Sequence, residues 1–380
     1  MINSRISSSL KLFALGILFA PALALAGCGG GGSDPVTPPV STPPASTTLR
    51  ATGLAHGIIM GAAADPAHLS ESNYATTLGS EFRQLEPENQ MKFEVIHPRP
   101  NTDPQPYDFS AADQLVTFAA AQNMVVRGHC FVWHNQIADW VTAGIANKTI
   151  DSVKLSDIMR THIATVAGHY AGKVWAWDVV NEALNDDGTM RSSPWYDQPG
   201  IGFAGKGTAY IEQAFNWAHA ADPAAKLFYN DYSAETLNAK SDAIYAMAKD
   251  FKTRGVPIDG IGFQLHVGLY FNDPAQLTSF AQNIKRFSDL GMEIHFTELD
   301  IALDSNSAAN LAAQADLYKK ITQVCVQTPN CKVVQTWGFT DKYSWIPGFS
   351  KGKQGWALPF DDNYNKKPAF QGILDGLNGK

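Results

Sequence analysis

Residues 174–182 read Val-Trp-Ala-Trp-Asp-Val-Val-Asn-Glu, a β-rich apolar run that ends in polar side chains. A short apolar run of this kind, between amphipathic segments, predicts a buried strand of a parallel sheet. The flanking segments 155–170 and 209–221 carry apolar residues three or four positions apart, which predicts helices. The stretch therefore predicts a strand between two helices, with an asparagine and a glutamate at the end of the strand.

The same alternation continues through most of the chain. Further amphipathic segments, and thus predicted helices, are 239–254, 277–290 and 311–326. The remaining strand candidates are 56–63, 81–85, 124–132, 226–230, 260–267, 293–299 and 333–339. Alternating strands and helices predict a parallel sheet with right-handed crossovers, and eight strands in one body favour closure into a (β/α)8 TIM barrel over an open sheet.

The composition excludes several classes of protein. Hydrophobic residues make up 45% of the 380 residues and charged residues 17%, which excludes disorder throughout. The formal net charge is -7 and the 29 Lys and Arg form no basic cluster, which argues against a nucleic-acid partner. Nine Trp and twelve Tyr suit the faces of sugars as well as a core. A neutral ligand therefore fits this chain best.

The N-terminus predicts export. Arg5 and Lys11 precede an apolar run at 12–25 that is shorter than the roughly 20 residues a membrane-spanning helix needs. We interpret residues 1–27 as a signal peptide. The sequence Leu-Ala-Gly-Cys that ends at Cys28 resembles the bacterial lipobox, which makes Cys28 the lipid attachment site; an ordinary secretion signal remains the alternative. Since Gly29 replaces the aspartate of inner-membrane lipoproteins, we expect the outer membrane if the host is Gram-negative.

The segment 28–49 is rich in Gly, Pro, Ser and Thr and predicts a tether, because it cannot bury a core. Residues 50–380 then form one catalytic or binding body. Cys325 and Cys331 flank a Thr-Pro-Asn turn and are expected to form a small disulfide in an exported protein. Cys130 lies in an apolar run and is interpreted as a buried hydrophobic residue.

Polar side chains gather at the predicted carboxyl ends of the strands, where catalytic groups of barrel enzymes lie. Glu182 ends the fourth strand and Glu298 the seventh, so their side chains are expected to flank a bound group in the barrel mouth. A glycosidic bond requires such a pair, one carboxyl group as acid and one as nucleophile or base. A structural salt bridge is the alternative for either glutamate alone, and it weakens when two glutamates share one mouth with several Trp.

Motifs in the same order along the chain resemble glycoside hydrolase family 10, the endo-β-1,4-xylanases. The resemblance covers the body from about residue 50. It rests on Trp177-Asp-Val-Val-Asn-Glu-Ala183 and Phe296-Thr-Glu-Leu-Asp300, with Glu88-Asn89-x-x-Lys92, Arg127-Gly-His129, Trp133-His-x-Gln136, Tyr229-Asn-Asp-Tyr232, Gln264-x-His266, Trp337-Gly338 and Asp341-Lys-Tyr-Ser-Trp345.

The resemblance implies a retaining double displacement on xylan, with Glu298 as nucleophile and Glu182 as general acid/base. Glu182 then needs surroundings that disfavour its charged form, and Glu298 needs donors that favour its charged form. His266, held by Asp300, is the expected donor to Glu298, and Asn181 is expected to bond the sugar 2-hydroxyl. The carboxyl groups should lie about 5 to 5.5 Å apart. No metal or organic cofactor is required.

The resemblance also implies the sugar-binding residues and a monomer whose ligands are xylan and xylo-oligosaccharides. A bulky indole penalises glucose, which carries a hydroxymethyl group where xylose has hydrogen. Core or rim packing is the alternative for the tryptophans. The implied binding residues are Glu88, Asn89 and Lys92 for the distal glycone sugar, His129, Trp133 and Gln136 for the sugar beside the cleavage point, Trp337 and Trp345 as aromatic walls, and Asn230, Tyr232 and Gln264.

Some residues depart from the family pattern. Asn135 replaces a usual serine, residues 130–131 replace Thr-Leu, and the segment 347–359 with Trp356 differs from many relatives, which leaves its effect on xylan side groups open. Three other functions remain. His129, His134, His266 and His295 could serve a metalloenzyme, but their spacing does not match a zinc site. The other two are sugar capture without catalysis and hydrolysis of β-glucan, mannan or aryl cellobiosides.

Overall fold

A computed structural model of the chain describes residues 47–379. The predicted signal peptide 1–27, the lipid attachment site Cys28 and nearly all of the predicted linker lie outside the described residues. Leu49 is fully buried and begins the first helix, with the Thr48 side chain accepting a hydrogen bond from the Ala51 N–H at its N-terminus. The folded body therefore includes Leu49.

The described residues form a (β/α)8 barrel, as the sequence predicts. Each strand pairs in parallel with its neighbours, and the pairing of β1 with β9 and of β6 with β8 closes the ring. The short β7 adds to β8 beyond the end of β6. The strands are β1 (Ile59–Ala64), β2 (Gln84–Pro87), β3 (Val125–Val132), β4 (Val174–Asn181), β5 (Lys226–Asp231), β6 (Gly260–Phe263), β7 (His266–Gly268), β8 (Glu293–Ala302) and β9 (Cys331–Thr336).

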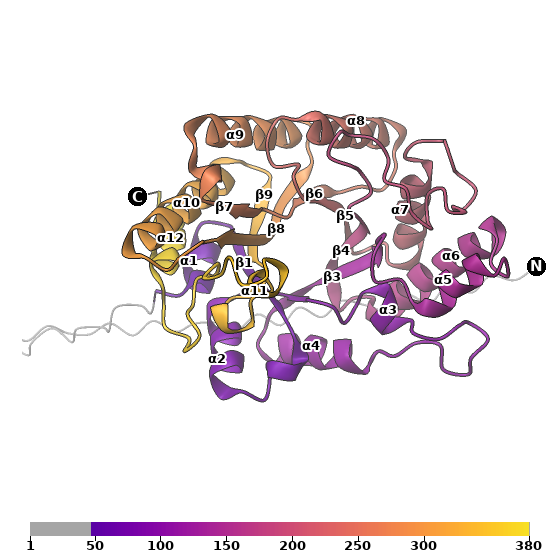
Figure 1. The fold of residues 1–380 in the computed structure, drawn as a ribbon, viewed down its shortest axis with the longest axis horizontal. Helices are drawn as coiled ribbons and strands as arrows, with labels where there is room; N and C mark the ends of the chain where they lie inside the picture. The colour runs from indigo at the N-terminus through magenta and orange to yellow at the C-terminus, as the bar shows by residue number, and fades with distance from the viewer. Residues whose placement is uncertain (1–46, 380) are drawn as a thin grey trace, which may run out of the picture. The chain divides into compact units, whose positions relative to one another are not determined.

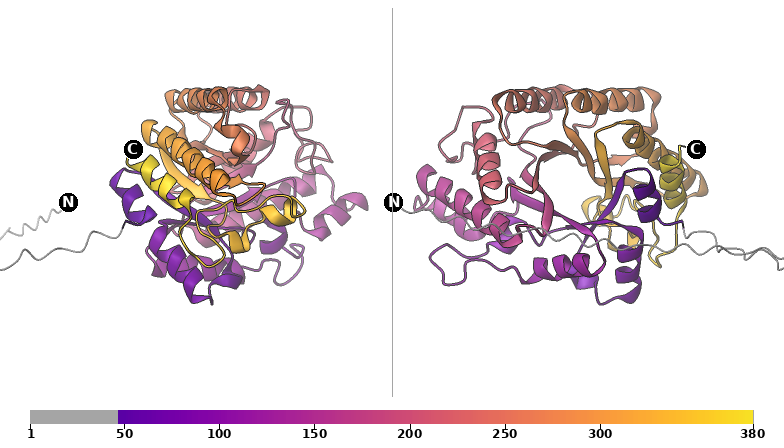
Figure 2. Two further views of the ribbon diagram at one scale, coloured as in Figure 1. Left: turned by 60° about the vertical axis from the view of Figure 1, so that its left-hand side comes forward. Right: turned by 180° about the vertical axis from the view of Figure 1, so that it is seen from behind.

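Helices surround the strands on the outside of the barrel (Figures 1 and 2). Their buried residues recur every three or four positions, as in α9, where Phe280, Ile284 and Phe287 face the core. The α-helices are α1 (Leu49–Ala55), α2 (Ser72–Glu81), α3 (Phe93–Ile96), α4 (Ser110–Ala121), α5 (Asp139–Ala146), α6 (Ser152–Tyr170), α7 (Ala209–Ala221), α8 (Ala239–Arg254), α9 (Pro274–Asp289), α10 (Ala308–Gln327), α11 (Ile346–Phe349) and α12 (Pro368–Leu377). Short 3₁₀ turns are η1 (Pro66–His68), η2 (Leu269–Asn272) and η3 (Asp341–Tyr343).

The predicted strand 260–267 is interrupted in the structure. Its first part is β6, and the chain then turns at Leu265, which has a φ of 63°, before β7 begins at His266. The buried Glu235 carboxylate accepts the Leu265 N–H at 3.0 Å and compensates for the lost ladder bond. This turn directs the neighbouring Gln264 and His266 toward the barrel mouth, so the irregularity serves the site.

Other predicted strands are shifted at their ends: the prediction 56–63 begins before β1, which starts at Ile59. The prediction 81–85 begins too early, because Glu81 closes α2 and its carboxylate accepts the Leu49 N–H at 2.9 Å. The prediction 333–339 ends too late, because β9 stops at Thr336 and Gly338 has a positive φ of 80° that only glycine adopts freely. The strand ends therefore depend on contacts that are distant in sequence.

The interior of the barrel below the mouth is polar. Arg127 is fully buried, donates from Nε to Asp178 Oδ2 at 3.0 Å, and lies with Nη1 2.7 Å from His295 Nδ1. Gly128 lets the Trp177 indole pass, since a Cβ at residue 128 would lie 2.1 Å from that ring. Ions and close packing thus fix the strands that carry the mouth residues.

Within residues 47–379, no helix has the length and apolar character that crossing a membrane requires.

Candidate active site

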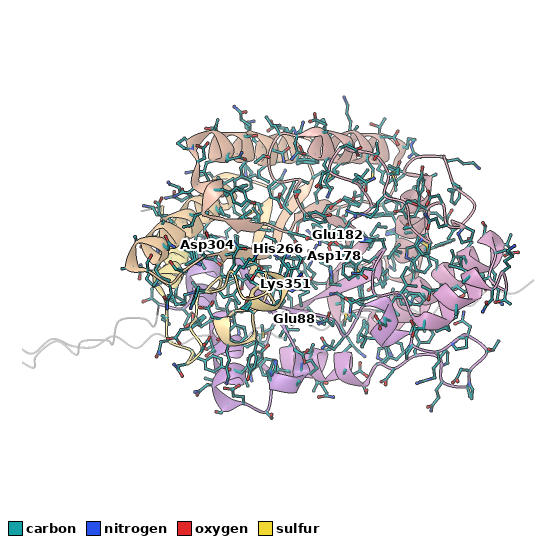
Figure 3. The ribbon with its side chains drawn as sticks, in the orientation of Figure 1. Glu88, Asp178, Glu182, His266, Asp304 and Lys351 are labelled. Atoms are coloured by element: carbon teal, nitrogen blue, oxygen red, sulfur yellow. A yellow bond between two sulfur atoms is a disulfide. The ribbon has the colours of Figure 1, made fainter. Side chains whose placement is uncertain are left out.

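A cleft of about 680 Å³ lies at the carboxyl ends of the strands. Glu182 and Glu298 both line it, together with residues from the loops after β3, β5, β6 and β9. Figure 3 shows Glu182 and His266 in this region, with Glu88 below them in the view. Among the predicted site residues, those that line the cleft are Lys92, His129, Trp133, Asn181, Glu182, Tyr232, Gln264, His266, Glu298, Trp337 and Trp345.

Glu298, in β8, is surrounded by hydrogen-bond donors. Its side chain is 6% exposed, Asn230 Nδ2 donates to Oε1 at 2.8 Å, and His266 Nε2 lies 3.0 Å from Oε2. Burial alone would raise the pKa of Glu298, but the hydrogen bond from His266, the nearby His129 and the Asn230 amide outweigh it and lower that pKa. Glu298 is therefore held as a carboxylate, the state a nucleophile needs.

His266 is held between two carboxylates. Its Nδ1 lies 2.9 Å from Asp300 Oδ2, and the Trp345 indole N–H donates to the same Asp300 oxygen at 2.8 Å. Burial would lower the pKa of His266, but Asp300 and Glu298 raise it well above its ordinary value. The imidazolium donates from both nitrogens, which fixes the Glu298 carboxylate and links it to the Trp345 wall.

Glu182, at the end of β4, has different surroundings. It has a φ of 55°, its N–H bonds the Asn230 carbonyl at 2.9 Å, and its side chain is 13% exposed. Trp133 Nε1 donates to Oε2 at 2.8 Å and Gln264 Nε2 donates to Oε1 at 3.1 Å. Neutral indole and amide donors thus orient this carboxyl group, whereas an imidazolium bonds Glu298.

Side-chain amides connect the two glutamates. Asn230 Nδ2 donates to Asn181 Oδ1 at 2.9 Å as well as to Glu298, and Gln264 Nε2 donates to Asn181 Oδ1 at 3.1 Å as well as to Glu182. Asn181 Nδ2 lies 3.3 Å from Glu182 Oε1. These shared bonds fix the relative positions of the two carboxyl groups, as two-step acid and nucleophile chemistry requires.

The predicted glycone residues after β2 also come together. Lys92 is buried, donates from Nζ to Asn89 Oδ1 at 3.0 Å, and lies 4.8 Å from the Trp133 ring centroid and 5.5 Å from that of Trp337. Gln136 Nε2 lies 3.5 Å from the same Asn89 oxygen. Cationic, amide and aromatic groups thus meet in one place, which suits the hydroxyls and faces of a sugar.

Glu88 lies next to this group. Burial and then the charge of Asp65 raise the pKa of Glu88 to about 7, although Lys92 opposes both. A carboxyl group with a pKa near neutral can donate a hydrogen bond to a sugar hydroxyl or accept one from it. Glu88 is thus suited to binding a neutral ligand.

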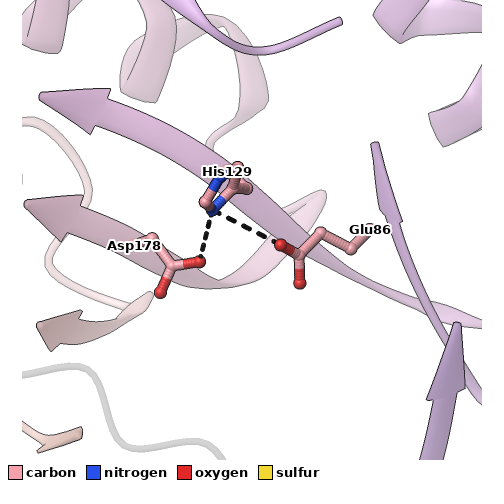
Figure 4. A group of neighbouring side chains, drawn as sticks. All are labelled: Glu86, His129 and Asp178. Carbon is pink, nitrogen blue, oxygen red and sulfur yellow. Dashed lines mark hydrogen bonds and ion pairs between the residues drawn. The ribbon is translucent and has the colours of Figure 1, made fainter. Parts of the chain in front are cut away.

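His129 belongs to a buried cluster with Glu86 and Asp178, the residues in Figure 4. Its Nδ1 lies 3.0 Å from Asp178 Oδ2 and 3.4 Å from Glu86 Oε1, and ligand atoms of the three residues lie within 4.8 Å of one another. Arg127 also contacts both carboxylates, with Nε 3.5 Å from Glu86 Oε2. Arg127 offsets the charge of Asp178, and burial and then the Asp178 charge raise the pKa of Glu86 well above its usual value, so the cluster fits a hydrogen-bond network around one ion pair better than a metal site.

The four histidines considered as metal ligands do not converge on one site. His295 bonds Arg127 and Glu293, and His134 Nδ1 lies 3.8 Å from Glu182 Oε2. His129 bonds Asp178, and His266 bonds Glu298 and Asp300. Each imidazole therefore supports a carboxylate.

Sequence analysis did not identify several residues that support the site. Arg191 donates to the Glu182 carbonyl at 2.9 Å and to the Tyr232 hydroxyl at 2.8 Å, and Lys240 lies 3.7 Å over the Tyr232 ring. Neither lies at a strand end, where the sequence predicts the catalytic groups. Tyr270 and Phe349, 68% and 74% exposed, line the cleft from η2 and α11. Tyr270 lies outside the motifs, whereas Phe349 belongs to the segment 347–359 that the sequence analysis singled out.

None of the cysteines in residues 47–379 lines the cleft. Cys325 and Cys331 are joined as a disulfide with a Cα separation of 5.2 Å, between the end of α10 and the start of β9. Cys130 is free and buried in β3. The disulfide thus closes the turn that leads into the last strand of the barrel.

The chain is similar to known proteins over its folded body. The family description "Glycosyl hydrolase family 10" matches residues 48–376. Endo-1,4-beta-xylanase B of Thermotoga neapolitana is 43% identical over 312 residues, 81% of this chain and 84% of the relative. Beta-1,4-xylanase of Dictyoglomus thermophilum is 42% identical over 322 residues, 81% of this chain and 86% of the relative.

Solved structures give the same result. Xylanase 10B from Thermotoga petrophila, in complex with xylobiose, superposes with a TM-score of 0.80 at 43% identity, covering 88% of this chain and 98% of that chain. Native xylanase 10B from Thermotoga maritima gives the same values. The similarity thus extends over the whole barrel, including every strand end that contributes to the cleft.

Proposed function

This chain belongs to glycosyl hydrolase family 10, and we propose that it hydrolyses internal β-1,4-xylosidic bonds of xylan with retention of configuration, with Glu298 as nucleophile and Glu182 as general acid/base. The observation that carries this proposal is the unlike environment of two carboxyl groups in one cleft. An imidazolium and an amide bond Glu298, whereas an indole and amides bond Glu182. The similar proteins are xylanases, one of them solved with xylobiose.

The first step forms a glycosyl-enzyme. A carboxylate oxygen of Glu298 attacks the anomeric carbon, the glycosidic bond breaks, and the Glu182 proton passes to the leaving oxygen. Asn181 is placed by Asn230 and Gln264 to bond the sugar 2-hydroxyl, a contact that strengthens in the transition state. We expect the two carboxyl groups at the separation of about 5 to 5.5 Å that direct attack requires.

The second step releases the sugar. Water adds to the anomeric carbon while the Glu182 carboxylate takes its proton, and the bond to Glu298 breaks. Both glutamates return to their starting states, and the anomeric carbon, inverted twice, keeps its β configuration. The chemistry needs no metal or organic cofactor.

Xylan is the proposed substrate because indoles crowd the cleavage point. Trp337 and Trp345 lie 6.5 and 5.0 Å from the His266 ring, between centroids, and Asp300 fixes the Trp345 indole through its N–H. A hydroxymethyl group would have to displace one of these rings. Glu88, Asn89, Lys92 and Gln136 then bind glycone hydroxyls, and Tyr232 contacts the sugar of the leaving group.

The proposal extends to the location of the protein. Residues 1–27 act as a signal peptide, Cys28 carries the lipid, and the segment from residue 28 to about residue 47 tethers the catalytic body, which begins with α1, to the cell envelope. Export suits an enzyme whose polymeric substrate lies outside the cell. Partition of the full chain into detergent, compared with a Cys28→Ser variant, tests the anchor; equal partition of both would exclude it.

The activity is tested by incubating the purified full chain with soluble xylan while following new reducing ends and, by NMR, the anomer formed first. We expect rapid release of β-configured oligosaccharides by the parent and severe losses for Glu182→Ala and Glu298→Ala. Glu94→Ala, at an exposed carboxylate on α3, is the matched control and should retain full activity. A folded parent that releases nothing would refute the function, and binding assays with xylan, β-glucan and mannan would then identify the ligand of the cleft.

A further inference from the structure

Lys240, in the first turn of α8, has a fully buried side chain. Its Nζ lies 2.8 Å from Asp231 Oδ1, 3.4 Å from Asp186 Oδ1 and 3.7 Å over the centre of the Tyr232 ring. Burying an ammonium group is unfavourable unless partners replace its hydration. Here the partners are two carboxylates and one aromatic face that lines the cleft.

Asp231 continues this contact toward the proposed acid/base residue. Its Oδ1 also accepts the Tyr232 N–H at 2.9 Å, and its Oδ2 accepts the Tyr229 hydroxyl at 2.6 Å. The Tyr229 oxygen in turn accepts the N–H of Ala183, the residue after Glu182, at 3.1 Å. A continuous chain of bonds thus runs from Lys240 to the backbone that orients Glu182.

Arg191 joins the same two residues from the other side. It donates from Nη2 to the Tyr232 hydroxyl at 2.8 Å, from the same nitrogen to the Leu184 carbonyl at 3.1 Å, and from Nε to the Glu182 carbonyl at 2.9 Å. Tyr232 is therefore held at its face by Lys240, at its backbone by Asp231 and at its hydroxyl by Arg191. The Tyr232 ring cannot shift without disturbing the Glu182 backbone.

We propose that Lys240 is a positioning residue that ties Tyr232, the wall of the leaving-group sugar, to the backbone of Glu182, so that the proton donor and the leaving oxygen stay aligned. The inference rests on the proposed function. The glycone residues Glu88, Asn89 and Lys92 follow β2, whereas Tyr232 follows β5 beside Glu182. The sugar that Glu182 protonates therefore lies against Tyr232.

The charge of Lys240 is needed for this alignment. Burial raises the pKa of Asp231 to about 7, although Lys240 and the Tyr229 hydroxyl oppose the effect. Without the ammonium group this pKa would rise further, so the Asp231 carboxyl would be protonated throughout the neutral range and lose acceptor capacity toward the Tyr229 hydroxyl and the Tyr232 N–H. The loss would reach Glu182 through Ala183, although Lys240 touches no substrate.

Misalignment of the proton donor should slow the cleavage of some substrates more than that of others. A sugar leaves as a strongly basic alkoxide and needs the Glu182 proton, whereas 2,4-dinitrophenolate leaves without one. The value of kcat/KM reports the steps up to glycosyl-enzyme formation and is independent of the later hydrolysis. We expect Lys240→Met to lower kcat/KM for xylohexaose by roughly 10- to 100-fold, part of the roughly 10²- to 10⁴-fold that a general acid contributes. For 2,4-dinitrophenyl β-xylobioside, where that contribution is absent, the expected change is less than about 3-fold.

The test measures both substrates with the full chain, for the parent, Lys240→Met and Lys249→Met. Lys249 is exposed on the same helix and serves as the matched control, expected to equal the parent on both substrates. A parent that cleaves neither substrate would refute the proposed function itself. An active parent with no loss in Lys240→Met, or with equal losses on the two substrates, would refute the role of Lys240 alone.

A second variant addresses folding. In Lys240→Met with Asp231→Asn no buried charge is left unpaired, and the amide oxygen still accepts the Tyr232 N–H, but the link to the Tyr232 face is lost. We expect the double variant to have a circular dichroism spectrum like that of the parent. We also expect it to lose activity on xylohexaose but not on the dinitrophenyl xylobioside, as Lys240→Met does. If neither variant folds, Lys240 serves stability alone and the proposal is overturned.

Discussion

The two sides of the cleft are supported differently. The glycone side, the loop with Glu88, Asn89 and Lys92, packs on uncharged rings. The leaving-group side, formed by Tyr232 and Glu182, is held by buried ions. Phe93, next to Lys92, stacks on His162 with 4.3 Å between centroids, and His97 Nδ1 lies 3.3 Å from His162 Nδ1. The leaving-group side depends instead on the contacts of Lys240, Asp231 and Arg191. One enzyme thus supports its two substrate-binding sides by opposite kinds of chemistry.

The imidazole pair must be neutral. His97 Nε2 lies 3.0 Å from the Asn101 amide oxygen, which requires a proton on that nitrogen and leaves Nδ1 as the acceptor for His162. Burial lowers the pKa of His97 to about 4, and burial and then the charge of His97 lower that of His162 well below its ordinary value. Tyr107, a neutral phenol, stacks on His97 and packs near His162. A second proton on either ring would place a positive charge in an apolar site.

The comparison shows that the type of support follows from what each side does. In the proposed function, the glycone side binds neutral hydroxyls, and packing is enough to support it. The leaving-group side would have to orient a residue that gains and loses a proton, and buried ions with hydrogen bonds fix an orientation more specifically than packing does. Substitutions on the two sides should therefore change activity and stability in different ways.

The largest expected effect separates the two glutamates. Glu298→Ala removes the nucleophile, and kcat/KM should fall by roughly 10⁴-fold or more on both xylohexaose and the dinitrophenyl xylobioside. Glu182→Ala should lose roughly 10²- to 10⁴-fold on xylohexaose but little on the activated substrate. Added azide should give a β-xylosyl azide only with the Glu182 variant. Similar losses for both variants on both substrates would refute the assignment of roles.

The second effect tests the glycone side. Asn89→Ala removes an amide that bonds Lys92, and a hydrogen bond to a charged group contributes about 1.5–3 kcal/mol, so kcat/KM should fall by roughly 10- to 100-fold. The loss should be equal for both substrates, since Asn89 acts on sugar binding and not on proton transfer. A loss confined to xylohexaose would mean that the two sides of the cleft are not independent.

The third effect concerns acid. His97 has a lower pKa in the folded protein than unfolded, so the unfolded chain binds more protons and stability falls as the pH drops from about 6.5 to 4. From His97 alone the loss is about 3 kcal/mol. His162→Phe keeps the ring stack without a titrating group, and its melting temperature should depend less on pH over this range than that of the parent.

His219→Phe, at an exposed position on α7, is the matched control and should show the pH dependence of the parent. If the His162 variant follows the parent curve, the histidine pair is not the acid-sensitive element of the glycone side.

The smallest expected effect is at His266, between the two sides of the cleft. His266→Gln removes the imidazolium that keeps the pKa of Glu298 low, so the acid limb of kcat/KM should move to higher pH. The parent should keep its activity to below the usual range of a glutamate, about pH 4.3. Measurement on the dinitrophenyl substrate isolates the nucleophile, and an unchanged limb would show that His266 does not control Glu298.

The features that the sequence did not predict depend on contacts between residues that are distant in sequence. The alternation of apolar strands and amphipathic helices predicted the barrel, because the burial of those faces leaves few other arrangements. Strand ends were less predictable: the break at Leu265 depends on Glu235, thirty positions away. Lys240 and Arg191 were missed because a buried lysine on a helix and an arginine in a loop have no local pattern that distinguishes them from solvated cations.

The sequence by itself determined the barrel and the residues at its mouth, because hydrophobic periodicity is local and parallel strands place their carboxyl ends together. Only the tertiary structure decided how those residues differ: which glutamate meets an imidazolium, which rings cover the cleft, and which buried cation holds Tyr232. The reason is physical, since burial and the electrostatic field at a side chain are sums over neighbours from several strands and helices. No single segment of the chain contains that information.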